Sequence, residues 1–142
     1  MFMGTYEHGM DAKGRVIVPA KLRESLGESF VVTLGLDGCL FAYPMEEWEG
    51  FIDKLKGLPG NKEGRKLQRH FMANAALCEV DKQGRTLIPA KLREAAGLTK
   101  DIVFVGVLSK IEIWSKEIYE ANDDFGDIDD IADHMSEFGL SF

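Results

Sequence analysis

The sequence of 142 residues lacks any long hydrophobic run. Its longest uncharged stretches, such as Ser29 to Leu36, fall far short of the roughly 20 apolar residues that a membrane-spanning helix needs. The N-terminus has no basic stretch leading into an apolar one, as a secretory signal would have. We therefore expect a cytoplasmic protein with no membrane partner.

Cysteine and histidine are also scarce. Cys39 and Cys78 form no CxxC pair and lie in apolar segments, so we expect buried free thiols in preference to a disulfide or a metal site. The three scattered histidines add no ligand cluster, and the GxxxxGK[ST], GxSxG and HExxH motifs are absent. The sequence predicts no metal site, no cofactor and no enzymatic activity.

Basic residues are missing from the end of the chain. Residues 117–142 hold nine acidic side chains and no Lys or Arg, whereas residues 1–116 hold 17 basic against 15 acidic side chains. The net charge of -7 therefore reflects the tail, and the rest of the chain has a balance of +2. Binding to the phosphates of duplex DNA is not excluded by the overall acidity.

The dominant positive feature is an internal repeat. Asp11 to Gly27 (DAKGRVIVPAKLRESLG) and Asp81 to Gly97 (DKQGRTLIPAKLREAAG) are identical at ten of 17 positions, and the similarity continues weakly beyond them. We place the two halves at residues 5–47 and 75–119, with a helical connector at 48–74 and an acidic tail at 120–142. Two equivalent halves predict a pseudo-twofold arrangement in which neither half folds alone.

Each repeat begins with the signature of a tight hairpin. Asp11 and Asp81 occupy the first position of a type I turn, and Gly14 and Gly84 occupy the last, where a left-handed residue completes a three-residue loop. The first turn connects a strand near residues Tyr6 to Met10 with a second strand at Arg15 to Val18. The second turn connects a strand at Leu77 to Val80 with a second strand at Arg85 to Ile88. The second strands are almost wholly apolar, which favours burial of both faces.

A short helix follows each second strand. Pro19 and Pro89 suit its first position, Gly27 and Gly97 suit a left-handed end, and we expect Leu22, Leu26, Leu92 and Ala96 to face the core. A pair of strands then completes each half. These four strands are expected at Phe30 to Leu34, Leu40 to Tyr43, Ile102 to Val105 and Ile111 to Trp114.

The connector is predicted to form two helices, Glu46 to Lys56 and Glu63 to about Asn74. The second has an amphipathic pattern in which basic side chains alternate with apolar ones. Its basic residues are Arg65, Lys66, Arg69 and His70. We favour a solvated helix face packed on the barrel over a direct contact with DNA.

The DxxxR unit in each turn is the strongest functional candidate. The carboxylates of Asp11 and Asp81 can accept backbone N–H groups and fix the loop, so that Arg15 and Arg85 are held for phosphate or guanine. Lys13 and Lys82 add positive charge beside them. The alternative is that Asp and Arg merely pair to stabilise the hairpin. A catalytic carboxylate pair is a weaker interpretation of the two Asp residues.

The duplicated PAKLRE segment supplies secondary candidates for DNA contact. These are Lys21, Arg23, Lys91 and Arg93. Two-turn helices commonly carry solvated charges, and the neighbouring Glu24 and Glu94 reduce the local positive field.

The paired DxxxR turns, the repeated GRxxxPAKLRE and the connector KLQRHFMANAALCEVD together resemble the MraZ family, bacterial regulators with two tandem domains of the SpoVT-AbrB type. The resemblance covers residues 1–119. It implies a mixed α+β, mainly β fold, a pseudo-twofold swapped-hairpin AbrB barrel made by the two tandem halves, with connector helices and a helical acidic tail.

The resemblance also implies a function. Family members are expected to form ring-shaped homo-oligomers, octamers or larger, that bind repeated sites in double-stranded DNA on the nucleoid. They repress the division and cell-wall gene cluster, including their own promoter. The motif residues carried over are Asp11, Arg15, Asp81 and Arg85, and both motifs are intact.

A second hypothesis is an AbrB-like protein-interaction module, similar to an antitoxin, that docks a partner through the acidic tail. Ile128, Ile131 and Phe138 lie among the tail carboxylates and could form such a segment. Alternatively, Ile128, Ile131 and Met135 make a short amphipathic helix that packs on a neighbouring subunit.

Overall fold

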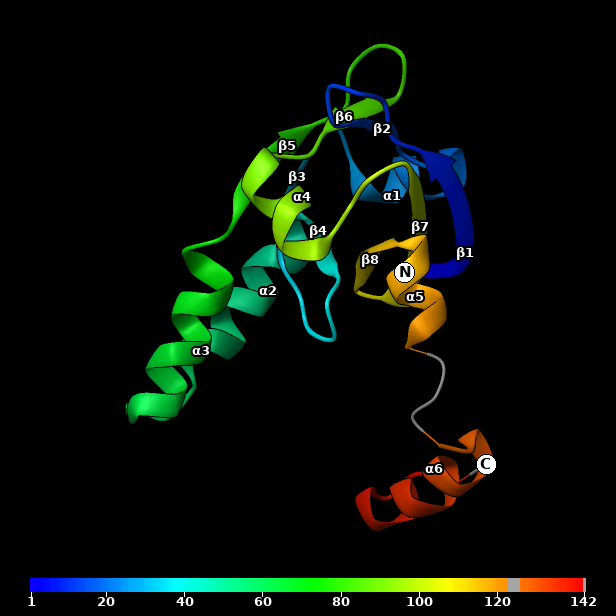
Figure 1. The fold of residues 1–142 in the computed structure, drawn as a ribbon. Coiled ribbons are helices and arrows are strands. Elements are labelled where there is room, and N and C mark those ends of the chain that lie inside the picture. The colour runs from blue at the N-terminus through cyan, green and yellow to red at the C-terminus, as the bar shows by residue number, and fades with distance from the viewer. Residues whose placement is uncertain (123–125, 142) are drawn as a thin grey trace.

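The computed structural model describes residues 1–122 and 126–141 (Figure 1). The fold is mixed and mainly β, with the two repeats in tandem. The strands are β1 (Phe2–Gly9), β2 (Arg15–Ile17), β3 (Ser29–Leu34), β4 (Leu40–Pro44), β5 (Ala76–Glu79), β6 (Arg85–Leu87), β7 (Asp101–Leu108) and β8 (Lys110–Ser115). The helices are α1 (Ala20–Leu26), α2 (Met45–Lys56), α3 (Lys62–Met72), α4 (Ala90–Ala96), α5 (Lys116–Ala121) and α6 (Ile128–His134), followed by the 3-10 turn η1 (Met135–Phe138).

Six strands form one antiparallel sheet in the order β1-β7-β8-β4-β3-β5. The order is symmetric about the β8–β4 pair once equivalent strands of the two repeats are matched. The first strand of each repeat pairs with the third strand of the other: Tyr6 lies opposite Phe104 in β1–β7, and Phe30 lies opposite Cys78 in β3–β5. Neither repeat can complete its part of the sheet without the other.

The remaining strands, β2 and β6, form a separate two-stranded antiparallel sheet, one strand from each repeat. It lies beside the end of β5 at the top of Figure 1. An isolated bridge between Met10 and Val16 connects the end of β1 to β2. Within the described residues, strand pairing gives these two sheets and does not close them into a barrel, so the expected barrel is not confirmed.

The central strands of the six-stranded sheet are buried on both faces, and side chains that alternate along a strand enter two different cores. In β3, Phe30 and Val32 belong to a core that includes Val16, Val18 and the inner faces of α1 and α4. Val31 belongs to a second core with Trp48 of α2 and Phe71 of α3. The sheet therefore separates the β2–β6 layer from the connector helices.

Most local predictions are confirmed. All eight strands form within a few residues of the expected positions, although β1 begins four residues earlier than the predicted Tyr6. The four helix positions expected in the core are buried. The connector forms two helices, with Trp48 and Leu55 buried in the first and Phe71 in the second. Cys39 and Cys78 are buried free thiols.

The prediction that β2 and β6 are buried on both faces is wrong. Val16 and Thr86 are inward and almost inaccessible, but the exposed fractions of Ile17 and Leu87 are 42% and 55%. The reason is that a two-stranded sheet laid over the core has only one face to bury. The almost wholly apolar composition of these strands did not show that their outer face was uncovered.

Smaller differences concern the helix ends. Pro19 and Pro89 precede the helices as N-cap residues and do not occupy the first helical position, because their ψ angles of 129° and 142° are extended. Gly97 ends α4 in the left-handed conformation. Gly27 has a positive φ of 85° but an extended ψ of 173°, so it is not left-handed helical.

The acidic tail contains α6 and η1, in agreement with the expected short helix. The side chain of Asp127 caps α6 by accepting the backbone N–H of Asp129 at 3.1 Å. Ile131 and Met135 are partly covered, while Ile128 and Phe138 are largely exposed.

Candidate functional site

The two DxxxR turns have the same geometry. In the first, the backbone N–H of Gly14 donates to the carbonyl of Asp11 at 3.0 Å, and the N–H of Asp11 donates to the carbonyl of Arg15 at 2.9 Å. In the second, Gly84, Asp81 and Arg85 repeat these bonds at 3.0 and 2.8 Å. The expected hairpin loops therefore form.

Glycine is required at the last position of each turn. The φ angles of Gly14 and Gly84 are 87° and 80°, a conformation that L residues rarely adopt. The bulge that results turns the chain directly into β2 and β6. The motif arginine is consequently the first residue of a strand and lies on its face, one residue beyond the loop.

Each turn carboxylate accepts three hydrogen bonds from its own loop. Oδ1 of Asp11 accepts the backbone N–H groups of Lys13 and Arg15 at 3.0 and 2.9 Å, and Oδ2 accepts Nε of Arg15 at 2.7 Å. Asp81 repeats the pattern with Gln83 and Arg85 at 2.9, 2.9 and 3.0 Å. The hydrogen bond from the Arg backbone N–H is the main cause that lowers the pKa of each carboxyl below its ordinary value.

Pairing with aspartate uses only part of each arginine. The bonds engage Nε of Arg15 and Arg85, and no acceptor among the described residues binds their terminal Nη atoms. The side chains of Arg15 and Arg85 remain 32% and 30% exposed. The carboxylate therefore holds the guanidinium in one orientation and leaves its outer edge able to donate two further hydrogen bonds.

The β2–β6 ladder places both arginines on one surface. Arg15 lies opposite Leu87, and Ile17 lies opposite Arg85. Because directly opposite residues and residues two apart share a face, these four side chains form a square with the arginines on one diagonal. Diagonal neighbours in such a ladder are about 7–8 Å apart. We call these four side chains the ladder face.

Sequence reasoning missed Ile17 and Leu87 as members of this face. Their equivalence in the repeat and their spacing of two from the arginines were visible in the sequence. What was missing was the antiparallel register between the two halves, which alone places each aliphatic side chain opposite the other half's arginine.

The remaining candidates divide into two groups. Lys13, Lys82, Lys21 and Lys91 are exposed. Arg23 and Arg93 are only partly exposed, and each donates to a backbone carbonyl of the segment before its own helix: Nη2 of Arg23 to Val18 at 2.8 Å, and Nη1 of Arg93 to Ile88. Arg23 and Arg93 therefore have structural partners of a kind that these lysines lack among the described residues.

The connector helix α3 keeps its basic side chains on the surface. Arg65, Lys66 and Arg69 are exposed, while Phe71 is buried in the second core. His70 is bound to the sheet through Nε2, which lies 2.9 Å from the carbonyl oxygen of Gly35. This placement agrees with a solvated helix packed on the sheet.

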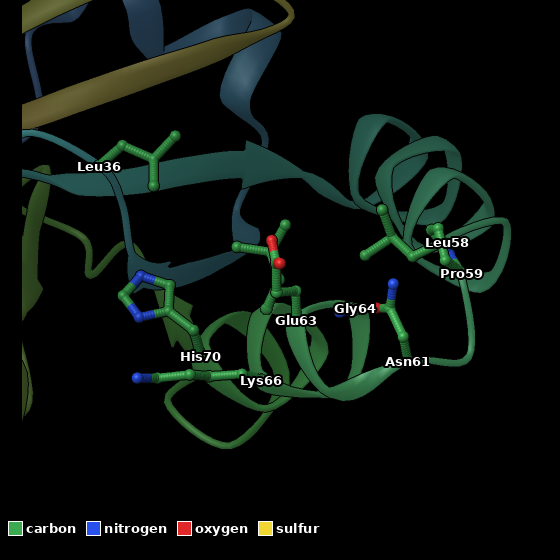
Figure 2. A pocket seen from close by; sticks show the side chains of 9 residues that line it. Leu36, Leu58, Pro59, Asn61, Glu63, Gly64, Lys66 and His70 are labelled. Atoms are coloured by element: carbon green, nitrogen blue, oxygen red, sulfur yellow. Dashed lines mark hydrogen bonds between the residues drawn. The ribbon is translucent and has the colours of Figure 1, made fainter.

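A mostly apolar hollow of about 510 Å³ lies between α3, the loop that precedes it and Leu36 (Figure 2). Glu63, Lys66 and His70 reach it from α3, and Leu58 and Pro59 from the loop. None of the turn or ladder residues lines it. The described residues contain no group of three His, Cys, Asp or Glu side chains able to hold a metal ion.

The pKa of the Cys39 thiol is raised to about 12, and that of Cys78 to about 11, mainly because both are buried. Neither sulfur is a nucleophile near neutral pH. In the part of the chain that the structure describes, no helix combines the length and the apolar character needed to cross a bilayer.

Comparison with known proteins identifies relatives along the whole chain. The family described as "MraZ protein, putative antitoxin-like" matches residues 1–70 and again residues 71–124. A protein of Lachnoclostridium phytofermentans named transcriptional regulator MraZ is 72% identical over 142 residues, covering all of both chains. Proteins of the same name from Clostridium beijerinckii and a Thermoanaerobacter species are 55% and 53% identical, over 99% of this chain and 100% of theirs. The chain belongs to the MraZ family.

Proposed function

We propose that this protein is a sequence-specific DNA-binding transcription regulator that contacts repeated upstream sites through Arg15 and Arg85. The observation that carries the proposal is the ladder face, where two guanidinium groups, each oriented by its own aspartate, lie on one surface. A planar fork held in this way matches phosphate oxygens or the O6 and N7 atoms of guanine. The relatives named transcriptional regulators support the same function.

A two-stranded antiparallel ribbon fits the width of the major groove. The ribbon β2–β6 has the outward charge for that contact, and the exposed Lys13 and Lys82 lie in the adjoining loops, where they supply phosphate contacts. Lys21 and Lys91 are exposed at the start of α1 and α4, four residues beyond the ends of the ribbon strands, and form the outer part of the interface.

The finer parts of the proposal concern assembly and targets. The exchange of β1 and β5 between the repeats supports the swapped-hairpin AbrB arrangement for units at residues 5–47 and 75–119. A ring homo-oligomer, octameric or larger, presents many ladder faces, so that weak individual contacts combine into strong binding. In this proposal the protein acts on the nucleoid in the cytoplasm. It represses the division and cell-wall gene cluster, including its own promoter.

A mobility-shift titration with the protein's own upstream region tests the DNA contact. The double variant Arg15→Ala, Arg85→Ala should lose at least about tenfold in affinity, because each base-reading arginine contributes about 1–3 kcal/mol. The matched control is Lys54→Ala, Lys62→Ala, which removes two exposed cations from the connector helices. Equal binding by wild type and the arginine variant would refute the assigned contact.

The connector gives a second arm to this experiment. If α3 were the contact surface, Arg65→Ala, Arg69→Ala would weaken binding more than the ladder variant does. Ring assembly is measured separately by light scattering on the purified wild type, the arginine variant Arg15→Ala, Arg85→Ala and the connector variant Arg65→Ala, Arg69→Ala. An unchanged particle mass in the arginine variant shows that any loss of affinity arises at the DNA contact.

The second candidate function is a protein-interaction module that uses the acidic tail. The observation in its favour is that Ile128 and Phe138 are 73% and 71% exposed among acidic side chains. A chain ending at Asn122 should still bind DNA under the first proposal. Loss of a captured partner in a pull-down, with DNA binding intact, would support the tail as an interaction segment.

A further inference from the structure

The side chain of Arg23 in α1 packs against the turn of the opposite repeat. A Cβ atom added to Gly84 would lie 2.6 Å from Cζ and 2.7 Å from Nη1 of Arg23. The equivalent contact joins Arg93 in α4 to Gly14, where an added Cβ would overlap Nη1. Each guanidinium therefore occupies the space directly beside a glycine that a side chain would fill.

Backbone hydrogen bonds complete the contact on both sides. The carbonyl of Val18 accepts Nη2 of Arg23 at 2.8 Å, while the N–H of Val18 donates to the carbonyl of Gly84 at 2.9 Å. In the other repeat, the carbonyl of Ile88 accepts Nη1 of Arg93, and the N–H of Ile88 donates to Gly14 at 3.0 Å. One residue thus binds both the arginine and the opposite glycine.

The environment of Arg23 differs from that of a surface cation. Its Nε atom is buried and has no hydrogen-bond partner among the residues that the structure describes. Burying an unpaired donor costs free energy that an apolar side chain of similar length would avoid. Lys21 and Lys91, on the same two helices, are exposed. Arg23 therefore has a contact with the opposite turn that the exposed lysines on these helices do not share among the described residues.

We propose that Arg23 and Arg93 are positioning residues that each fix the DxxxR turn of the opposite repeat, so that each DNA-contacting arginine is oriented by both halves of the chain. Arg93 fixes the turn that carries Arg15, and Arg23 fixes the turn that carries Arg85. This inference rests on the proposed function for its consequence in DNA binding, but the contact itself is testable without DNA.

Hydrogen exchange measured by mass spectrometry on the full-length protein tests the contact. In Arg93→Met, exchange should accelerate in the segment 10–16 and stay unchanged in 80–86; in Arg23→Met, the pattern should reverse. Lys91→Met is the matched control for loss of one cation from α4 and should change neither segment. Equal acceleration in both turns, or in neither, would overturn the proposal.

The conservative variant Arg93→Lys gives a second test that does not depend on loss of charge. Lysine keeps the positive charge but lacks the planar group that lies on Gly14 and donates to Ile88. Exchange in the segment 10–16 should therefore remain faster than in wild type. Full protection with lysine would show that charge suffices and would contradict positioning through the planar guanidinium.

Salt dependence separates positioning from direct contact. If Arg93 bound a phosphate, its removal would lower the slope of log affinity against log salt by about 0.9 for each phosphate that is no longer neutralised. A positioning residue acts through Arg15, so Arg93→Met should lower the slope by no more than Arg15→Ala does and should leave it unchanged when added to Arg15→Ala. We expect Arg93→Met to lose about fivefold or more in affinity, and no more than Arg15→Ala loses. A further fall in slope when Arg93→Met is added to Arg15→Ala would refute the assignment.

Double variants test which turn each arginine serves. Arg93→Met and Arg15→Ala should be non-additive, because both act on one contact, whereas Arg93→Met and Arg85→Ala should be additive. The opposite pattern would refute the cross-repeat assignment. If the wild-type protein bound no DNA, the proposed function would fail, while the exchange experiment would still decide whether the arginines hold the turns.

Discussion

Ile17 and Arg85 lie directly opposite each other in the β2–β6 ladder, so an exposed aliphatic side chain from one repeat adjoins the arginine of the other repeat that we propose contacts DNA. Leu87 and Arg15 repeat the relationship. Solvent-exposed aliphatic groups inside a polar contact surface are suited to the methyl group of thymine in the major groove.

The double variant Ile17→Thr, Leu87→Thr should therefore bind the upstream region more weakly than wild type. Its free energy of unfolding should change by no more than about 1 kcal/mol, because both positions are exposed and threonine suits a strand. Mobility-shift titrations with thymine and with deoxyuridine in the site measure the contact. Removing the methyl groups should weaken wild-type binding more than binding by the variant, whose smaller threonine methyls keep only part of the contact; identical responses of the two proteins would contradict a methyl contact by Ile17 and Leu87.

Acid should loosen the turns through Asp11 and Asp81. The pKa of each carboxyl in the folded protein is lowered from an ordinary value of 3.8, so the folded state binds fewer protons than the unfolded state at acidic pH. The contribution of these two carboxylates to the stability of the fold is complete when the pH is above their ordinary pKa. It is lost as the pH falls through their lowered pKa in the folded protein.

Urea unfolding of wild type and of Asp11→Asn, Asp81→Asn measures this effect. Asparagine keeps an acceptor oxygen but does not titrate in this range. The variant should be less stable than wild type at about pH 6, and the difference should shrink towards about pH 2 as the wild-type carboxyls are protonated. A difference independent of pH would show that the carboxylate charge has no part in the turn.

Glycine substitutions should have opposite signs at two positions. Gly14→Ala forces an L residue to a φ of 87° and makes its Cβ overlap the Arg93 guanidinium, so it should cost at least about 1–3 kcal/mol of the free energy of unfolding. Gly50→Ala, in the exposed middle of α2 with no atom near its added Cβ, should gain about 0.5–1 kcal/mol. Thermal unfolding of the two variants provides the comparison, and stabilisation by Gly14→Ala would rule out the strain argument.

Separated halves should not fold as monomers. In residues 1–74, β1 is without its partner β7, and in residues 75–142, β5 is without its partner β3. We expect each fragment to lack a cooperative unfolding transition at concentrations where it is monomeric, and an equimolar mixture to regain one. Cooperative unfolding of either monomeric fragment would refute this prediction.

The local chemistry of the turns was predictable because it depends on residues within a few positions of one another. Asp11, Gly14 and Arg15 form their hydrogen bonds inside a single loop, and the second repeat has the same three residue types at the equivalent positions. The short helices and the buried position of Leu22 were likewise visible in the spacing of apolar residues. The two equivalent halves, the acidity of the tail and the family follow from the sequence by itself.

Only the tertiary structure decided how the halves meet. The exchange of β1 and β5, the exposure of Ile17 and the contact of Arg93 with Gly14 all depend on segments that lie far apart in the chain. No local pattern encodes such contacts, because they depend on the register between strands and on which face of a two-stranded sheet the core covers. The residue types that can contact DNA are present in each repeat; their assembly into one surface required both repeats to pack together.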